Sequence, residues 1–159
     1  MKNIKIFKNT IGQDMRGLIW TSWDKKLYPK KIFNRDKFSL SKKNVLRGLH
    51  YDLKSWKLIS CVYGKFFFVV VNFNKKSKDY LKFKTWILSH KENKSILIPP
   101  LYANGHLCLS DSCVFHYKMS YLGSYPDVKD QISIKWNDQR FNIKWPISKK
   151  KIILSKRDL

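Results

Sequence analysis

Acidic residues are scarce in this chain of 159 residues, which has 11 Asp and Glu against 33 Lys and Arg, and Glu92 is the single glutamate. The formal net charge is therefore +22 at pH 7. A charge of this size is typical of nucleic-acid-binding proteins, but the lysines are spread over the whole chain and no RNA- or DNA-binding motif is present. We expect no nucleic-acid partner, and binding of single strands stays an alternative.

Cysteines and long apolar runs are also few. Cys61, Cys108 and Cys113 are odd in number and form no C-x-x-C pair, so neither a disulfide framework nor a zinc site is indicated. We expect these thiols in the core. No run approaches the ~18 apolar residues of a membrane-spanning helix, and the start of the chain lacks the features of a signal peptide. We expect a cytoplasmic protein with no membrane partner.

Histidine occurs only at His50, His90, His106 and His116. A metal-binding β-barrel usually needs a close His-x-His pair with a nearby acid, and this arrangement is absent. The few glycines form no phosphate-binding loop, and no G-x-S-x-G turn is present. The sequence therefore predicts no metal and no cofactor.

Short segments of alternating apolar and polar residues fill most of the chain, which predicts an all-β fold. Residues 66–71 are apolar without alternation, so we expect a central strand that is buried on both faces between two sheets. These features favour a jelly roll in one domain, residues 1–159. The expected strands are 3–7, 17–23, 57–63, 66–73 (paired with 57–63 across Gly64), 83–88, 95–98, 106–109, 113–119, 132–136 and 141–145, with a short helix within 24–33.

Several short motifs follow one another along the chain, of which Leu-Arg-Gly-Leu-His-Tyr at 46–51 is the most distinctive. In this order they resemble the motifs of the dTDP-4-dehydrorhamnose 3,5-epimerase family. The resemblance implies a cofactor-free, cupin-like jelly-roll barrel (a double-stranded β-helix) that is normally a homodimer. The other motifs lie at 14–17, 57–59, 98–100, 103–105, 109–111, 117–118, 125–126, 134–138, 143–146 and 154–158.

Members of this family invert carbons on either side of a 4-keto group in a nucleotide-linked sugar. Such a reaction needs a base on one face, an acid on the other and a group that stabilises the enolate oxygen. By resemblance, His50 is the base, Asp158 orients its ring, Lys57 stabilises the enolate and Tyr117 is the acid. Strand alternation directs Tyr117 and Lys57 towards the barrel interior. The expected substrate-binding residues are Arg16 and Arg47, for the pyrophosphate, and Asn104, His106, Tyr125 and Trp136.

The chain also departs from the family pattern. Asn104 replaces a usual histidine, Trp56 replaces a usual glutamine, and Thr21 stands where an acid is common. These departures leave the identity of the substrate open. The chain resembles short, lysine-rich members of the family that act on GDP-linked 4-keto-heptoses in bacterial capsule or O-antigen synthesis, and a dTDP-linked 4-keto-6-deoxyhexose is the alternative. Inversion at C3, at C5 or at both stays open. A 3,4-ketoisomerase on the same scaffold and a non-catalytic protein that binds a sugar nucleotide are further alternatives.

Overall fold

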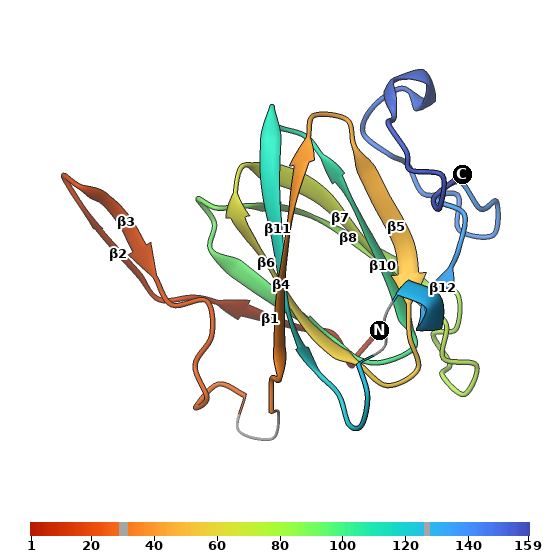
Figure 1. Ribbon diagram of the computed structural model, residues 1–159, viewed down its shortest axis with the longest axis horizontal. Helices are drawn as coiled ribbons and strands as arrows, with labels where there is room; N and C mark the ends of the chain where they lie inside the picture. Colours follow the sequence, from red (N-terminus) through yellow and green to blue (C-terminus); the bar gives the residue numbers. More distant parts are fainter. Residues whose placement is uncertain (29–31, 126–127) are drawn as a thin grey trace.

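Two five-stranded antiparallel sheets face each other in the computed structural model, which describes residues 1–28, 32–125 and 128–159 (Figure 1). The strand order is β1-β9-β6-β11-β4 in the first sheet and β12-β5-β10-β7-β8 in the second. The predicted all-β jelly roll is confirmed. The strands are β1 (Lys5–Lys8), β2 (Ile11–Asp14), β3 (Gly17–Trp20), β4 (Arg35–Lys42), β5 (Leu46–Tyr51), β6 (Trp56–Tyr63), β7 (Lys65–Asn72), β8 (Phe83–Ser89), β9 (Lys94–Ile98), β10 (Tyr102–Cys108), β11 (Ser112–Ser120) and β12 (Ile132–Ser133), with short 3-10 helices η1 (Val128–Asp130) and η2 (Lys149–Lys151).

The turn at Gly64 connects the two sheets. The prediction that β6 and β7 pair is wrong, because β6 pairs with β9 and β11, whereas β7 pairs with β8 and β10. Gly64 has a φ of 73°, and a Cβ there would lie 2.1 Å from the carbonyl oxygen of Ser112. Glycine therefore allows the chain to cross from one sheet to the other at this point.

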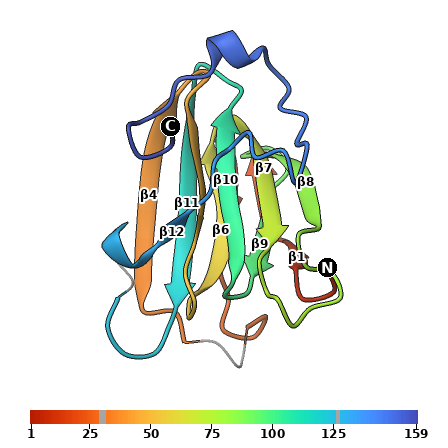
Figure 2. The same ribbon diagram turned by 90° about the vertical axis from the view of Figure 1, so that its right-hand side faces the viewer.

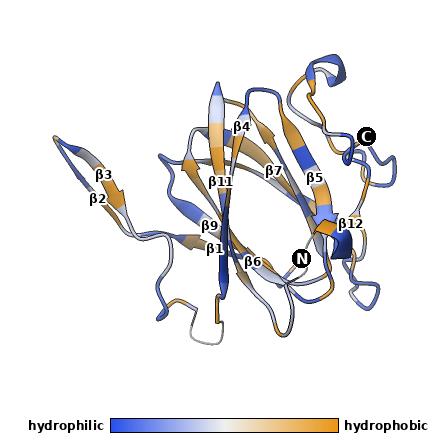
Figure 3. Ribbon diagram, in the orientation of Figure 1, coloured by the Kyte–Doolittle hydropathy of each residue, from blue (hydrophilic) through white to orange (hydrophobic). Residues whose placement is uncertain are grey.

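Strand β7 is buried on both faces, as predicted. Phe66, Phe68 and Val70 point into the core between the sheets, where they join Ile59, Cys61 and Phe115 among others. The opposite face carries Val69 and Val71, and it is covered by the segment after β12 instead of by a third layer of strands (Figure 2). Much of β7 accordingly has the colour of hydrophobic residues in Figure 3, whereas η2, which consists of three lysines, has the colour of hydrophilic residues.

The covering segment explains two wrong strand predictions. Residues 141–145 form no strand, and the strand expected at 132–136 is limited to Ile132–Ser133. Phe141 packs on Phe73 with its ring centroid at 5.6 Å, and the Trp145 indole donates to the carbonyl of Trp136 at 3.0 Å. An extended segment that packs one side on a sheet shows the same alternation as a strand, although its backbone forms no ladder.

The remaining predictions concern the N-terminal half and the thiols. Residues 24–28 and 32–33 contain no helix, and the rest of the expected helix, 29–31, lies outside the described residues. This segment instead packs aromatic side chains, such as Tyr28 and Phe33, on the outside of the first sheet. All three cysteines are buried and free, as expected. Among the described residues, no helix is long and apolar enough to cross a membrane.

The hairpin of β2 and β3 extends away from the barrel (Figure 1). It forms a separate two-stranded sheet in which Asp14 pairs with Gly17 beside the turn. Its apolar side chains are largely exposed, with Ile19 at 76% and Met15 at 101%. A two-stranded hairpin alone has marginal stability in water.

Candidate active site

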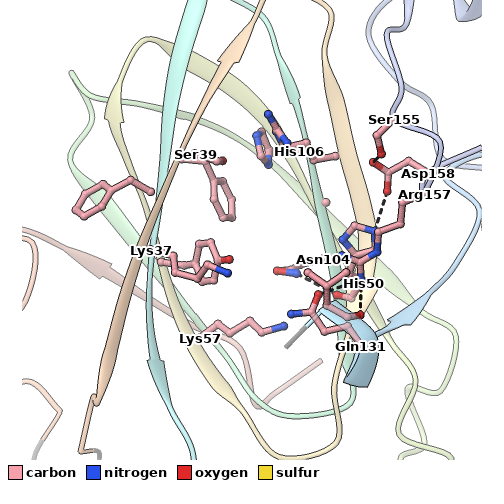
Figure 4. A pocket seen from close by; sticks show the side chains of 16 residues that line it. Lys37, Ser39, His50, Lys57, Asn104, His106, Gln131, Ser155, Arg157 and Asp158 are labelled. Atoms are coloured by element: carbon pink, nitrogen blue, oxygen red, sulfur yellow. Dashed lines mark hydrogen bonds and ion pairs between the residues drawn. The ribbon is translucent and has the colours of Figure 1, made fainter. Parts of the chain in front are cut away.

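A pocket with a cavity volume of about 310 Å³ opens inside the barrel, between the two sheets (Figure 4). Its walls include β4, β6 and β11 from the first sheet, β5 and β10 from the second, and the C-terminal segment. Seven of the predicted site residues line it together: Arg47, His50, Lys57, Asn104, His106, Tyr117 and Asp158.

His50 and Asp158 are in direct contact, with the His50 Nε2 atom 2.7 Å from a carboxylate oxygen of Asp158. His50 is the last but one residue of β5 and faces the pocket, whereas Asp158 lies behind it and is only 7% exposed. Burial acts to raise the pKa of Asp158, but hydrogen bonds from His50 and Ser155 outweigh burial and hold this pKa below its ordinary value. The carboxylate therefore stays charged and orients the imidazole.

Asp158 is the penultimate residue, and it is nevertheless fixed in place. Its carboxylate accepts hydrogen bonds from the Ser155 hydroxyl at 2.8 Å and from the backbone N–H of Gly48 at 3.4 Å. A bridge between Val45 and Ile153 joins the last segment of the chain to the start of β5. The end of the chain thus belongs to the wall of the pocket.

Lys57 and Asp52 form a buried ion pair beside this histidine. The Lys57 Nζ atom lies 3.1 Å from Asp52 Oδ2, and the two residues are 5% and 3% exposed. Burial lowers the pKa of Lys57, and the attraction of Asp52 opposes that shift. The alternation of β6 places Lys57 on the same face as Ile59 and Cys61, which lie in the core, so its ammonium enters the pocket from an apolar wall.

Tyr117 lies on β11, across the pocket from β5. It shares the inward face of its strand with Phe115, with 5.5 Å between the ring centroids. Burial raises the pKa of Tyr117, and the nearby ammonium of Lys37 opposes that rise. The phenol is therefore kept protonated at neutral pH and has a proton to give.

Arg47, Asn104 and His106 line the pocket on the side of the second sheet. The Arg47 guanidinium donates to the Ser41 hydroxyl at 3.0 Å, and Asn104 donates to the backbone carbonyl of His50 at 3.1 Å. His106 is 3% exposed and stacks on Phe115 with a centroid distance of 4.3 Å. Burial lowers the pKa of His106 to about 3, so its ring is neutral at ordinary pH.

Three predicted substrate-binding residues lie elsewhere. Arg16 is at the tip of the projecting hairpin, where it pairs with Asp14 at 2.6 Å, because the turn between β2 and β3 carries it away from its own barrel. Trp136 is outside the pocket as well, since it packs with Leu46 in a separate cluster. Tyr125 does not line the cavity, but its hydroxyl accepts a hydrogen bond from Lys37, which does, at 2.8 Å. The next residue of its motif, Pro126, lies outside the described residues.

Sequence reasoning missed several residues of the site: Lys37, Ser39, Asp52, Gln131, Ser155 and Arg157. The guanidinium of Arg157 donates to Gln131 Oε1 at 3.1 Å and to the Ser133 hydroxyl at 3.3 Å, which links the last residues of the chain to β12. Only Ser155 and Arg157 carried a signal, because they lie in the C-terminal motif of Asp158. Within the described ranges, no group of three or more His, Cys, Asp and Glu side chains is placed to hold a metal ion.

Comparisons with known proteins agree with this geometry. The family model described as dTDP-4-dehydrorhamnose 3,5-epimerase matches residues 1–159. A dTDP-4-dehydrorhamnose 3,5-epimerase of Shigella flexneri is 33% identical, over 99% of this chain and 88% of its own length. The corresponding enzyme of Escherichia coli K12 is 31% identical over the same shares. A solved dTDP-6-deoxy-D-glucose-3,5-epimerase of Legionella pneumophila, in complex with dTDP-4-keto-L-rhamnose, has a TM-score of 0.91 and 32% identity, with 99% of this chain and 86% of that chain covered.

A cupin-like jelly roll whose pocket holds an imidazole, a phenol and an ammonium has the groups that proton removal and return require. Together with these relatives, the fold and the pocket define the protein as an isomerase of the epimerase class. Within that class, the chain belongs to the dTDP-4-dehydrorhamnose 3,5-epimerase family.

Proposed function

We propose that this epimerase inverts C3, C5 or both in a nucleoside-diphosphate-linked 4-keto sugar. The observation that carries the proposal is the 2.7 Å contact of His50 with Asp158, in a pocket that Lys57 and Tyr117 also line. Carbons 3 and 5 are both next to the C4 carbonyl, so the loss of a proton from either gives an enolate.

The steps follow from the placement of the side chains. His50 takes the proton from C3 or C5, and the electron pair of that C–H bond moves into the enolate with its negative charge on O4. Lys57 stabilises this oxyanion with its ammonium. Tyr117 then gives its proton to the carbon from the opposite face. Water returns a proton to the tyrosinate and takes one from the imidazolium, so only the configuration of the carbon has changed.

The charges of the pocket suit a diphosphate. Lys37, Arg47 and Arg157 line the cavity together with Lys57, and Asp158 is the acidic residue that lines it. A guanidinium presents two parallel N–H donors to phosphate oxygens, so Arg47 and Arg157 are the proposed contacts of the pyrophosphate. The surplus of positive charge would hold the nucleotide while His50 removes a proton from the sugar.

The proposed substrate is a GDP-linked 4-keto-heptose used in the synthesis of a bacterial surface polysaccharide, in the cytoplasm. The proposal is supported by the resemblance of this short, lysine-rich chain to family members that act on such sugars, and Asn104 in the pocket and Trp56 before Lys57 in the sequence depart from the usual family pattern. The relatives described above are named for dTDP-linked sugars, so a dTDP-linked 4-keto-6-deoxyhexose is the substrate to compare.

A homodimer is part of the proposal. Arg16 lies on a hairpin that projects from the barrel with exposed apolar side chains, such as Ile19, so a second copy of the chain is the surface that would cover the arm. Arg16 would then contact a pyrophosphate in the pocket of the partner. Light scattering during gel filtration tests this assembly, and a monomer at micromolar concentration would contradict it.

Deuterium incorporation from D2O tests the reaction. With GDP-4-keto-heptose and dTDP-4-keto-6-deoxyglucose as paired substrates, proton NMR should show deuterium at C3, C5 or both for the preferred nucleotide. His50→Asn should slow this exchange roughly 10²–10⁴-fold, because it removes the base. His90→Asn is the matched control, since His90 lies outside the pocket beside Tyr63 and should exchange like the wild type.

Other results would contradict the proposal. No exchange with either substrate would reject the reaction, and binding without exchange would identify a sugar-nucleotide-binding protein. A 3-keto product would identify a ketoisomerase. Exchange by His50→Asn at the wild-type rate would show that His50 is not the base.

A further inference from the structure

Asp52 is the buried acid of the site that none of the steps above uses. It lies in the loop between β5 and β6, directly after the strand that carries His50 and five residues before Lys57. The backbone carbonyl of Asp52 accepts a hydrogen bond from the N–H of Leu101 at 3.0 Å, which ties this loop to the turn before β10. The loop is therefore attached to this turn as well as to β5 and β6.

The two carboxylate oxygens of Asp52 have separate partners. Oδ1 accepts the backbone N–H groups of Ser55 at 2.6 Å and Lys54 at 3.1 Å, which closes a tight turn over residues 52–55. Oδ2 faces the Lys57 Nζ atom at 3.1 Å. The turn thus fixes the position of the carboxylate, and Oδ2, which takes no part in the turn, fixes the position of the Lys57 ammonium.

The other groups around Lys57 do not replace this carboxylate. His50 on β5, Tyr117 on β11, Lys37 on β4 and Arg157 in the C-terminal segment line the same pocket, and three of the four are cationic or become so on protonation. Asp158 is in contact with His50. Among the described residues, Asp52 is the acid that forms an ion pair with Lys57.

We propose that Asp52 is a positioning residue, whose carboxylate keeps Lys57 in its ammonium form and directs it into the pocket. The inference rests on the proposed function, because it gives Lys57 the enolate oxygen to stabilise. A buried ammonium without a counter-ion loses its hydration and releases its proton, and a neutral amine stabilises an oxyanion far less well.

The effect of pH has a definite sign. Burial and the charge of Arg157 both lower the pKa of Lys57, and Asp52 raises it. Without the carboxylate the pKa of Lys57 falls further. As the pH rises, a variant without this carboxylate therefore loses the ammonium at a lower pH than the wild type does. The exchange reaction is lost with it.

Asp52→Asn tests the inference, because an amide oxygen still accepts the N–H groups of the turn while the negative charge is removed. The alkaline limb of the pH profile of kcat/KM for deuterium exchange should move down by about one unit or more. At pH values above the shifted limb, kcat should fall while KM changes little, and Asp52→Glu should restore the limb. Asp111→Asn is the matched control, since Asp111 pairs with Lys43 on the surface with its side chain 98% exposed.

A second readout does not depend on activity. The 15N spectrum of the lysine ammonium groups, with Lys57 assigned from the Lys57→Arg variant, should give a lower pKa for Lys57 in Asp52→Asn than in the wild type. An unchanged pKa and an unchanged pH profile in folded Asp52→Asn would overturn the inference and leave the proposed function intact. A wild type without exchange would reject the proposed function, while the ammonium titration would still test the ion pair. If Asp52→Asn fails to fold, an Asp52→Glu protein with a lowered Lys57 pKa would also overturn the inference.

Discussion

His50 and His106 line the same pocket in opposite surroundings. His50 contacts the carboxylate of Asp158 at 2.7 Å, which orients its ring. His106 is stacked on Phe115 near the guanidinium of Arg47, and burial lowers its pKa to about 3. The His50 ring is therefore oriented by a charged partner, whereas the His106 ring stays neutral and supplies shape and a hydrogen-bonding nitrogen.

His106 should make the folded protein sensitive to acid. A histidine that titrates near pH 6.5 in the unfolded chain and at about 3 in the folded protein binds its proton only after unfolding, between these two values. The free energy of unfolding should therefore fall as the pH drops through this window, by up to about 1.4 kcal/mol per pH unit. Urea denaturation of the wild type and His106→Gln between pH 4 and pH 7 measures the slope. The variant should have the shallower one, and equal slopes would contradict the assigned cause.

The sequence predicted most members of the site that lie in ordered motifs, apart from Ser155 and Arg157, and it missed those that depend on packing. Strand alternation directed Tyr117 inward, and the structure places it on the pocket. Lys37 reaches the pocket because β4 pairs with β11, where Lys37 lies opposite Tyr117. No local sequence pattern predicts which strand pairs with β4. Trp136 was assigned to the site because it lies in a motif, but its position is set by a hydrophobic cluster with Leu46.

At the scale of the elements, an irregularity in β5 brings Arg47 and His50 to one pocket. Residues three apart face opposite sides of a regular strand, yet both side chains line the cavity. In the pairing with β10, His50 lies opposite Asn104 and Arg47 opposite His106, so β5 has one residue more than its partner over this stretch. Gly48 lies inside it with a φ of 113°. The bulge resets the alternation of the strand.

Gly48→Ala should therefore disrupt the site. A Cβ at this position would lie 2.6 Å from the backbone of Asn104 and Gly105, so neither strand has a flexible side chain that can move aside. We expect a loss of about 2 kcal/mol or more in the free energy of unfolding, and a larger loss of activity, because His50 and Arg47 move with the strand.

Gly17→Ala is the control for this substitution. Gly17 has a similar φ of 124°, but its Cβ would meet nothing within 4 Å. Its cost in urea denaturation measures the effect of the backbone angle alone, and the difference between the two variants measures the contact with β10. Equal costs would mean that the close approach of β5 and β10 is not important for stability.

Strands with polar inward faces were the hardest elements to predict. Strand β4 contributes Lys37 and Ser39 to the pocket wall, and its buried Ser41 lies beside His106. Its apolar residues Phe38 and Leu40 are instead 62% and 66% exposed, so they do not mark a buried face of the strand. Strand β5 was missed because Gly48 interrupts its alternation. Strand β7, with apolar residues on both sides, was predicted correctly because its burial does not depend on function.

At the scale of the whole molecule, attraction of a small anionic substrate accounts for the net charge of +22 without nucleic-acid binding. Most of the lysines are exposed, and a few cations line the pocket. A surface field of this sign would draw a sugar diphosphate towards the cavity, and dissolved salt would weaken the attraction. Bound substrate would be held by the few cations in the pocket. Of these, Arg47 and Arg157 can donate two hydrogen bonds at once to a phosphate.

The assembly decides what Arg16 does. In one chain this side chain pairs with Asp14 at the tip of the hairpin, and it is 86% exposed. If the arm packs against a second copy, Arg16 contributes to the pocket that contains the partner's catalytic groups. Each pocket of the dimer then uses His50 from one chain and Arg16 from the other, and a defect in one residue can be compensated by a chain with a defect in the other.

Mixing Arg16→Ala with His50→Asn tests this sharing of the site. Each variant alone should have low activity in the deuterium-exchange assay. After the subunits are allowed to exchange, half of the dimers contain one chain of each kind, and one of their two pockets has both His50 and Arg16. The activity should recover to roughly a quarter of the wild-type value. Recovery should require subunit exchange, so variants cross-linked as homodimers before mixing are the control. No recovery, with mixed dimers present, would place Arg16 outside the partner's pocket, because every pocket with an intact His50 would then have gained nothing from the arm of the other chain.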